Sequence, residues 1–262
     1  CAMNQIKEPL RKISAVIITN NEEKNIERCI DSLIGVVDEI IVIDSFSTDK
    51  TEEICKSKNV RFVQHEWEGF SKSKNFGNQL VTYDLILSLD ADEALSVDLQ
   101  NSLLDLKNKS DVFEAYSLNR RTNFCGNWIN HSGWYPDQKL RLWNKNRGHW
   151  EGEIHEKIKL NNNATIEHLN GDLLHYSYHT ISDLNIQIEK FSNISSRSDF
   201  QKGKRTSYIG IYLHAIGKTF KKYVVQKGFL DGRDGIIIAV TSGYATFLKY
   251  TKLYMLQKER EK

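Results

Sequence analysis

Two carboxylates one residue apart, Asp90 and Asp92, stand where an apolar run ends. The run DLILSLD covers residues 84–90, and its composition predicts a buried strand. At the carboxyl end of such a strand the two carboxylates repel each other and lose hydration, so they need a cation or a strong donor network. Mg²⁺ or Mn²⁺ shared with substrate phosphates meets that need. The alternative is an Asp-rich turn in which Asp92 or Ser96 caps the next helix.

The elements that position these carboxylates follow from a repeated pattern. Runs rich in Val and Ile cover residues 13–19, 39–44, 60–65 and 84–90, and helical periodicity separates them. Strands that recur with helices between them predict an α/β fold with a mainly parallel sheet. Further strands are expected at 113–124 and 139–143, and Thr48 or Asp49, Ser71 and Ser96 are expected to cap the helices that follow them.

Domain organisation follows from the loss of this alternation and from charge. We expect a catalytic domain over residues 13–180, with a nucleotide-binding half at 13–93 and an acceptor half at 94–180, followed by a basic helical region at 181–262. Residues 197–262 hold 14 Lys and Arg against 5 Asp and Glu, although the whole chain carries only +2. Nucleic acid is not an expected partner.

Some function classes are disfavoured by missing motifs. No GxGxxG follows a strand and no GxxxxGK[ST] is present, so neither a dinucleotide-binding dehydrogenase nor a P-loop enzyme is expected. Four cysteines without metal-ligand spacing favour a reduced, cytosolic setting. The first twelve residues lack the apolar core of a signal peptide, so export is not expected.

Four ordered motifs resemble glycosyltransferase family 2, the inverting enzymes with a nucleotide-diphospho-sugar-binding fold of the GT-A type. They are VIITNNEEKNI (16–26), VIDSFSTDKT (42–51), SKSKNFGNQL (71–80) and LDADE (89–93). The later segments GWYPDQKLRLWNKNRGHWEGEIHEKI (133–158), HYSY (175–178) and GFLDGRDG (228–235) are similar to the subgroup that adds glucose or a related sugar to heptose in the lipopolysaccharide inner core. Asn20 departs from the aromatic residue of many members, and the absence of QxxRW argues against processive synthesis.

The resemblance implies a donor site for a UDP-sugar at the carboxyl ends of the strands. It assigns Asp44 to the imide N–H of uracil, and Lys74 to the neighbourhood of the diphosphate. The alternative for Asp44 is a strand-end carboxylate bonded to nearby backbone amides. The residues that would frame the base and ribose are Thr19, Asn21, Glu22 and Ser45. For these framing residues helix capping is the alternative, and for Lys74 it is a solvated position on a helix face. We expect Asp49 to be a structural helix cap.

The resemblance also implies roles for the metal and the catalytic base. Asp92 is expected to be the direct ligand of a divalent cation, with Asp90 bonding ribose or a metal-bound water. A histidine, His175 or His155, is expected to complete the shell. Glu156 is the expected base, with Asp137 and then Glu153 as alternatives, and Arg141 would hold the donor phosphates or an anionic acceptor group, unless it faces solvent. The candidate residues are Glu156, Asp137, Thr19, Asn21, Glu22, Asp44, Ser45, Lys74, Asp90, Arg141, Asp92 and His175.

The basic C-terminal region contains two uncharged runs, residues 206–217 and 235–248. A helix of 14 residues extends about 21 Å, short of the roughly 30 Å of a bilayer core. Lysines and tyrosines at the borders instead predict helices that lie in the headgroup region of an anionic leaflet. The alternative is packing on the catalytic domain or on a second subunit, so an oligomer is also open. The expected location is the cytoplasmic, inner face of the cytoplasmic membrane.

Together these observations predict a metal-dependent inverting glycosyltransferase. It would move a hexose, glucose by the subgroup resemblance, from a UDP-sugar to a lipid-linked saccharide such as lipopolysaccharide core heptose. A sugar nucleotidyltransferase is the alternative enzyme, disfavoured because no Gly-rich, Arg-containing loop follows the first strand. A noncatalytic scaffold that binds glycan or nucleotide is the alternative from another class.

Overall fold

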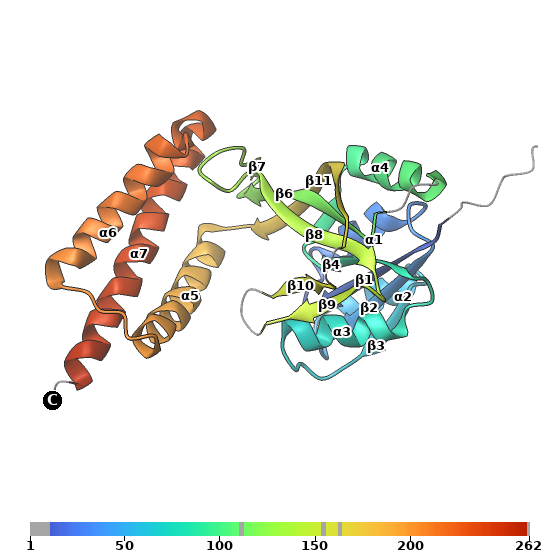
Figure 1. The fold of residues 1–262 in the computed structure, drawn as a ribbon, viewed down its shortest axis with the longest axis horizontal. Helices are drawn as coiled ribbons and strands as arrows, with labels where there is room; N and C mark the ends of the chain where they lie inside the picture. Colours follow the sequence, from blue (N-terminus) through green and yellow to red (C-terminus); the bar gives the residue numbers. More distant parts are fainter. Residues whose placement is uncertain (1–10, 110–112, 153–155, 162–163, 261–262) are drawn as a thin grey trace, which may run out of the picture. The chain divides into compact units, whose positions relative to one another are not determined.

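The computed structural model describes residues 11–109, 113–152, 156–161 and 164–260. The chain forms two compact units (Figure 1). The first consists of Cys1–Arg120 and Gln138–His175, and the second of Arg121–Asp137 and Tyr176–Lys262. Residues 121–137, expected from the sequence in the acceptor half of the catalytic domain, thus belong to the same compact unit as the C-terminal helices. The functional boundary expected near residue 180 stays a prediction.

The first unit is an α/β layer structure built on one large sheet, with a second, two-stranded antiparallel sheet formed by β9 and β10. Its elements, including strands β6, β8 and β11 that continue into the second unit, are β1 (Ile13–Thr19), α1 (Ile26–Leu33), β2 (Glu39–Asp44), α2 (Thr51–Ser57), β3 (Arg61–Gln64), α3 (Phe70–Leu80), β4 (Leu85–Asp90), β5 (Glu93–Leu95), α4 (Val97–Asn108), β6 (Ala115–Phe124), β8 (Asp137–Asn144), β9 (Gly148–Glu151), β10 (Lys157–Leu160) and β11 (Ile166–Tyr178). The strand order is β3-β2-β1-β4-β8-β6-β11-β5. Strands β3, β2, β1 and β4 are parallel, whereas β8 pairs antiparallel with β4. The expected mainly parallel α/β fold is confirmed.

Alternating side chains of the buried strands supply both faces of this sheet. Along β1, Ala15 and Ile17 pack into one core with Ile30 of α1, whereas Val16 packs into another core on the opposite face. Helix α3 lies against β1 and β2, and a Cβ atom at its Gly77 would stand 2.5 Å from the Val16 side chain. Strands buried on both faces explain why these runs are continuously apolar.

The helix starts match the predicted caps in part. Ser96 accepts a hydrogen bond from Leu99 N at the start of α4, as expected. The expectation for Ser71 is wrong, because α3 begins at Phe70 with Gly69 as its N-cap. Ser71 instead lies in the first turn, where its hydroxyl donates to the carbonyl oxygen of Gly152.

The second unit is mainly helical. Its further elements are β7 (Asn127–Trp128), α5 (Ile181–Gln201), α6 (Tyr208–Phe220), the π-helical turn η1 (Lys221–Val225), the 3₁₀ turn η2 (Gly228–Asp231) and α7 (Gly232–Arg260). A small core joins Phe124 and Ile129 to Leu184 of α5 and Ile238 of α7. Across the described residues, no helix combines the length and apolar character that crossing a bilayer would require.

Segment 121–137, which contains the end of β6 and the short strand β7, is bonded to the helices of this unit through the carboxylate of Asp231. That carboxylate accepts hydrogen bonds from the backbone N–H groups of Asn130 and His131 at 3.1 Å and from the Ser132 hydroxyl at 2.8 Å. Lys222 donates to the carbonyl oxygen of Ser132 at 2.7 Å. These polar contacts over about 100 residues of sequence separation explain why segment 121–137 belongs to the helical unit, and sequence periodicity carries no signal for them.

Candidate active site

The strand register brings three of the predicted site residues to one edge of the sheet. Thr19, the last residue of β1, is the register partner of Asp44, the last residue of β2. On the other side of β1, Ile18 is the partner of Asp90 at the end of β4. Because these strands are parallel, their carboxyl ends form a shared edge, which is where ligands bind in sheets of this kind.

A fully buried lysine links two of the candidate carboxylates. Lys74 of α3 has no solvent exposure, and its Nζ lies 2.9 Å from Asp90 Oδ1 and 3.0 Å from Glu156 Oε1. The same ammonium lies 4.4 Å from the centre of the Trp150 ring. The solvated-lysine alternative for Lys74 is therefore wrong, because burying this ammonium is compensated by two carboxylates and an aromatic face.

Arg141 holds the other oxygen of Asp90. Its guanidinium lies 3.0 Å from Asp90 Oδ2 and 2.7 Å from Glu93 Oε1, and the residue is 4% exposed, so the solvent-facing alternative is wrong. Although burial raises the pKa of Asp90, Lys74 and Arg141 outweigh it and hold that pKa far below its usual range. Burial in turn lowers the pKa of Arg141, but Glu93 and Asp90 raise it above its usual value. Asp90 is ionised and already neutralised by protein cations.

Asp92 has a different environment. Its Oδ2 lies 3.2 Å from Nε2 of His175 on β11, and both side chains keep some access to solvent. No lysine or arginine within the described part of the chain forms an ion pair with Asp92. Among the described residues, no group of three His, Cys, Asp or Glu side chains is arranged so that it could hold a metal ion.

These residues fit a divalent cation that is shared with a substrate. Mg²⁺ is commonly held by only one or two carboxylates together with phosphate oxygens and water. Asp92 Oδ2 and His175 Nε2 lie 3.2 Å apart and offer two ligand atoms. Asp90 fits a direct ligand role less well, because Lys74 and Arg141 occupy its two oxygens. The geometry thus suits Asp92 and His175 as the residues that would hold a cation.

The loop after β2 is built by local hydrogen bonds around Asp44. The buried Asp44 carboxylate accepts from the backbone N–H of Ser47 at 2.9 Å and from the Ser47 hydroxyl. Asn21, with a φ of 56°, accepts from the Thr48 N–H at 2.8 Å. The carbonyl oxygen of Ser45 accepts from Asn20 at 2.6 Å. The two loops that follow β1 and β2 are therefore tied together at the carboxyl edge.

Two further predicted residues at this edge are Glu22, whose pKa is shifted, and Thr19, whose hydroxyl is buried. Burial raises the pKa of Glu22, and so do the charges of Asp92, Asp49 and Asp90, although a hydrogen bond from Asn25 opposes them. The Thr19 hydroxyl is buried without a protein hydrogen-bond partner among the described residues. An excess of negative charge and an unsatisfied hydroxyl here are features of an edge that is completed by a ligand.

Asp49 is structural, as expected, but it is not the N-cap of α2, which is Lys50 and has no side-chain cap hydrogen bond. Its carboxylate accepts from the Thr51 N–H at the start of α2 and from the Glu23 N–H, both at 3.0 Å. Asp137 is the first residue of β8 and is counted with the second unit. The alternatives Glu153 and His155 lie outside the described residues.

Sequence reasoning missed Glu93 and Trp150 as members of this cluster. The Glu93 side chain is fully buried. It forms an ion pair with Arg141 and also lies 3.6 Å from Arg120. Its position directly after Asp92, at a strand end, was the available signal. Trp150 covers the buried lysine, but five tryptophans in the chain gave no basis for choosing it.

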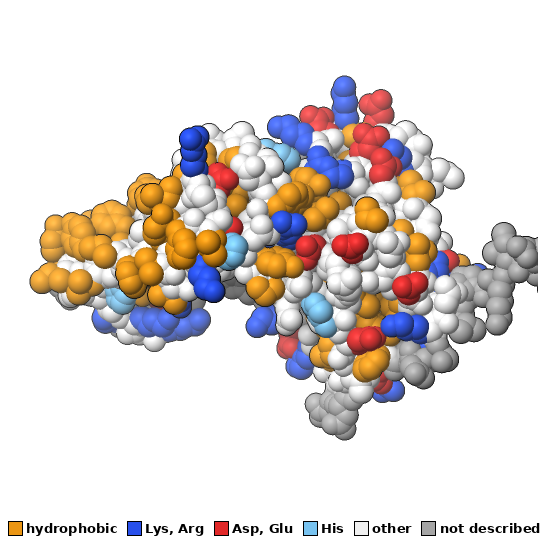
Figure 2. Space-filling model, turned by 90° about the horizontal axis from the view of Figure 1, so that it is seen from above, with side chains coloured by type: hydrophobic (Ala, Val, Ile, Leu, Met, Phe, Trp, Pro, Cys, Tyr) orange, Lys and Arg blue, Asp and Glu red, His pale blue; other side chains and the backbone are white. Residues whose placement is uncertain are grey.

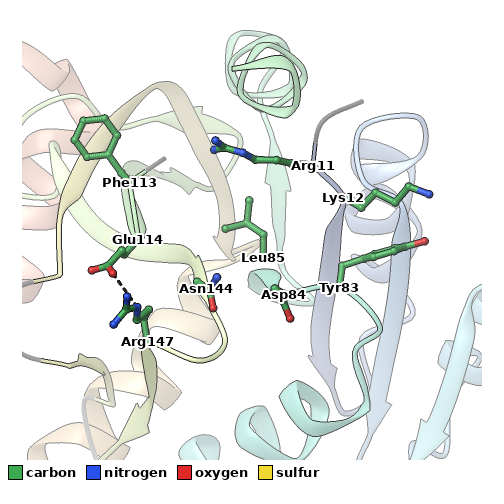
Figure 3. A pocket seen from close by; sticks show the side chains of 9 residues that line it. All are labelled: Arg11, Lys12, Tyr83, Asp84, Leu85, Phe113, Glu114, Asn144 and Arg147. Carbon is green, nitrogen blue, oxygen red and sulfur yellow. Dashed lines mark ion pairs between the residues drawn. The ribbon is translucent and has the colours of Figure 1, made fainter. Parts of the chain in front are cut away.

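A separate cavity of about 560 Å³ lies at the other end of β4, which begins at Leu85 (Figure 3). Its charged side chains are mostly paired with protein groups. Arg147 lies 2.8 Å from Glu114, and Asp84 lies 3.3 Å from Lys145. This cavity therefore shares no residue with the cluster around Asp90 and offers little unpaired charge.

The sheet, with its ligand edge of carboxylates beside buried cations, defines an α/β enzyme of the GT-A type. The model of the family described as "Glycosyl transferase family 2" matches residues 14–162, which is more than half of the chain. The chain belongs to glycosyl transferase family 2, and it is a glycosyltransferase with the GT-A fold expected from its sequence.

Relatives extend the similarity over the C-terminal unit. An uncharacterized glycosyltransferase of Rickettsia bellii is 32% identical, over 93% of this chain and 86% of the relative. The lipopolysaccharide core biosynthesis glycosyltransferase LpsC of Rhizobium meliloti is 26% identical, over 94% of this chain and 93% of LpsC. Among solved structures, glucosyl-3-phosphoglycerate synthase of Mycobacterium tuberculosis with Mn²⁺ and UDP-glucose matches at 26% identity and a TM-score of 0.38, over 42% of this chain and 44% of that chain.

Proposed function

We propose that this chain transfers a hexose from a UDP-sugar to a hydroxyl of a lipid-linked saccharide by direct, inverting displacement. The observation that carries the proposal is the buried Lys74 between Asp90 and Glu156. It ties the residue expected beside the donor to the residue expected to activate the acceptor. Such a connection suits one site in which both substrates meet.

The donor half of the proposal rests on the carboxyl edge of β1, β2 and β4. Asp44 and Thr19 are register partners there. Both Asp44 oxygens already accept from Ser47, so a uracil imide N–H would use a remaining lone pair on one of them. Asn21, Glu22 and Ser45 lie in the two loops that follow. Arg141 keeps a buried Nε without a hydrogen-bond partner among the described residues, so it has capacity for a phosphate oxygen.

The leaving group of such a reaction is a nucleoside diphosphate. A divalent cation, when bound to both phosphates, would stabilise the negative charge that develops on them. Asp92 and His175 would hold that cation, and His175 must be neutral to do so. Asp90, fixed by Lys74 and Arg141, would bond ribose or a cation-bound water, as the sequence resemblance implies.

The acceptor hydroxyl needs one base and no covalent intermediate. Glu156 is the proposed base: Lys74 holds its Oε1 at 3.0 Å and thereby orients the carboxylate, whose Oε2 would accept the hydroxyl proton. Lys74 is thus a positioning residue for Glu156. Asp137 is retained as the alternative base.

The acceptor class follows from the similarity to LpsC, whose name assigns it to lipopolysaccharide core biosynthesis. A lipid-linked saccharide, such as a core heptose, is therefore the proposed acceptor, and glucose is the proposed sugar. An acceptor embedded in a leaflet requires the enzyme to work at a membrane surface.

The second unit offers a surface suited to that location. Ile209, Leu213, Ile216 and Phe220 form the apolar face of α6 and are 69%, 64%, 66% and 59% exposed. Figure 2 shows hydrophobic side chains gathered at the left, over the helices of the second unit. We propose that this face enters the headgroup region of an anionic cytoplasmic leaflet, with neighbouring basic residues such as Lys221 contacting phosphates.

The proposal is tested by incubating the chain with UDP-glucose, Mn²⁺ and a lipopolysaccharide core acceptor that lacks its glucose. UDP release that depends on acceptor, together with a product of inverted anomeric configuration by NMR, is the expected result. Retained configuration would contradict direct displacement. No transfer from UDP-glucose, UDP-galactose or UDP-N-acetylglucosamine would contradict a UDP-hexose donor.

A further inference from the structure

A cavity of about 330 Å³ lies within the second unit, between α5, α6 and α7. Trp134 and Tyr178 also line it, with ring centres 5.5 Å apart. This volume is at the lower end of the range for small-molecule pockets. None of the residues assigned to the transfer reaction lines it, and neither its residues nor its test requires the transfer reaction.

The charge of the cavity wall has one sign. Lys218, Lys222 and Lys249 line it, and no Asp or Glu does. Lys249 is paired with Asp199 at 2.6 Å. Within the described part of the chain, no carboxylate pairs with Lys218 or Lys222. The wall therefore carries two lysines whose charge the protein leaves uncompensated.

Lys222 is a buried ammonium, and without a carboxylate partner among the described residues its charged form is destabilised. The residue is 9% exposed, and its ammonium donates to the carbonyl oxygens of Ser132 at 2.7 Å and Gly133 at 3.5 Å. Burial, together with the charges of Lys218 and Lys221, lowers the pKa of Lys222 to about 8. A buried ammonium near a second lysine is stabilised by any anion that enters.

The remaining wall is suited to a saccharide. Gln187 and several hydroxyl groups line the cavity, among them Ser195 and Ser242, whose hydroxyls have no hydrogen-bond partner among the described residues. Trp134 and Tyr178 offer the flat apolar surfaces on which sugar rings pack. A cavity for acyl chains alone would not need these polar groups.

We propose that this cavity binds a phosphate monoester carried by a saccharide. Lys218 and Lys222 would contact the phosphate, while the hydroxyl groups, Gln187 and the two aromatic rings would contact the sugar. Such a site would let the second unit hold a phosphorylated part of a glycan without taking part in the chemistry.

The test is calorimetric titration of the full chain with four probes: glucose 6-phosphate, glucose, inorganic phosphate and dihexanoylphosphatidic acid. Saturable binding of one glucose 6-phosphate, tighter than binding of glucose or inorganic phosphate, is expected. Equal binding of inorganic phosphate would overturn the saccharide assignment, as would tighter binding of the phosphatidic acid. No binding of glucose 6-phosphate would overturn the site itself.

Lys218→Met and Lys221→Met form a matched pair for the same titration. Both remove one positive charge from exposed neighbouring positions, but only Lys218 lines the cavity. Lys218→Met should weaken glucose 6-phosphate binding roughly tenfold, as expected for the loss of one charge-assisted hydrogen bond. Lys221→Met should leave it nearly unchanged. Equal weakening by both variants would show general charge attraction and overturn the site. UDP binding, measured on the same preparations, reports on the transfer site separately.

Discussion

Lys74 Nζ lies 2.9 Å from Asp90 Oδ1, although no part of Lys74 reaches solvent. Together with Arg141 on the other carboxylate oxygen, this lysine neutralises Asp90 from within the protein. Asp92, two residues away, has only His175 as a neighbouring partner among the ion pairs of the described residues. The two aspartates of one short motif thus have different environments: Asp90 is fixed by two protein cations, whereas Asp92 pairs with His175, and we propose Asp92 as the ligand of an added cation.

Removing the buried lysine should destabilise the protein. Lys74→Met would leave Asp90 and Glu156 without their shared partner, and breaking a buried ion pair in this way costs about 3 kcal/mol. Lys72→Met is the matched control, because Lys72 is 70% exposed in its side chain and lies 3.8 Å from Glu68. Its free energy of unfolding should change by less than about 0.5 kcal/mol. Urea unfolding measures both, and equal stability of the two variants would argue against the buried pair.

Substituting the proposed base should separate binding from turnover. Glu156→Gln keeps the size of the side chain but loses the carboxylate, so turnover should fall by about 10² to 10⁴ while UDP affinity is retained. Glu151→Gln removes a carboxylate from an exposed strand position paired with Lys159, and it should leave turnover unchanged. UDP release and UDP titration check both quantities. Near-normal turnover in Glu156→Gln would transfer the role to Asp137.

The decrease in the free energy of unfolding at low pH should depend on Asp90. Because Lys74 and Arg141 outweigh burial and hold the folded-state pKa of Asp90 below its unfolded value of about 3.9, the ionised form stabilises the fold. That contribution is complete above the unfolded pKa and is lost as the pH falls through the folded pKa. The difference in unfolding free energy between the protein and Asp90→Asn should be constant above about pH 5 and shrink below about pH 4.

Asp105→Asn is the control for this pH series, because Asp105 is exposed on α4. Its unfolding free energy should follow that of the unaltered protein at each pH between 3 and 7. If the Asp90→Asn difference were the same at pH 3 as at pH 6, the ion pairs with Lys74 and Arg141 would not be stabilising Asp90 in its charged form.

Sequence patterns predicted the parallel strands closely because burial on both faces leaves uninterrupted apolar runs, as in β1 and β4. They also predicted which strand ends carry polar groups, because Asp44 and Asp90 follow such runs directly. The burial of Lys74 was not predictable, since Lys72 and Lys74 look alike in the sequence. Lys74 differs from Lys72 because it contacts Glu156 and Trp150, which lie 76 or more positions further along the sequence.

The assignment of segment 121–137 to the helical unit was not predictable either. It depends on Asp231, whose carboxylate is bonded by two backbone N–H groups and by Ser132. Asp231 lies in GFLDGRDG (228–235), and an Asp among glycines predicts a turn. Sequence periodicity does not report contacts of this kind.

Membrane binding should depend on the apolar face of α6. Ile216→Glu places a charge in the centre of that face and should reduce flotation with vesicles that contain anionic lipid. Ile34→Glu is the control, since Ile34 is 55% exposed in the first unit, compared with 66% for Ile216. Flotation should remain unchanged in the control and should weaken with rising salt in the unaltered protein. Unchanged flotation of Ile216→Glu would contradict this orientation.

Calorimetric titration with UDP, in the presence and absence of Mn²⁺, tests whether Asp92 and His175 bind the cation that holds the donor. We predict that Mn²⁺ strengthens UDP binding to the unaltered chain, and that Asp92→Asn and His175→Ala remove most of this gain while Asp105→Asn keeps it. UDP binding that is the same with and without Mn²⁺, or a gain that survives in Asp92→Asn, would contradict it.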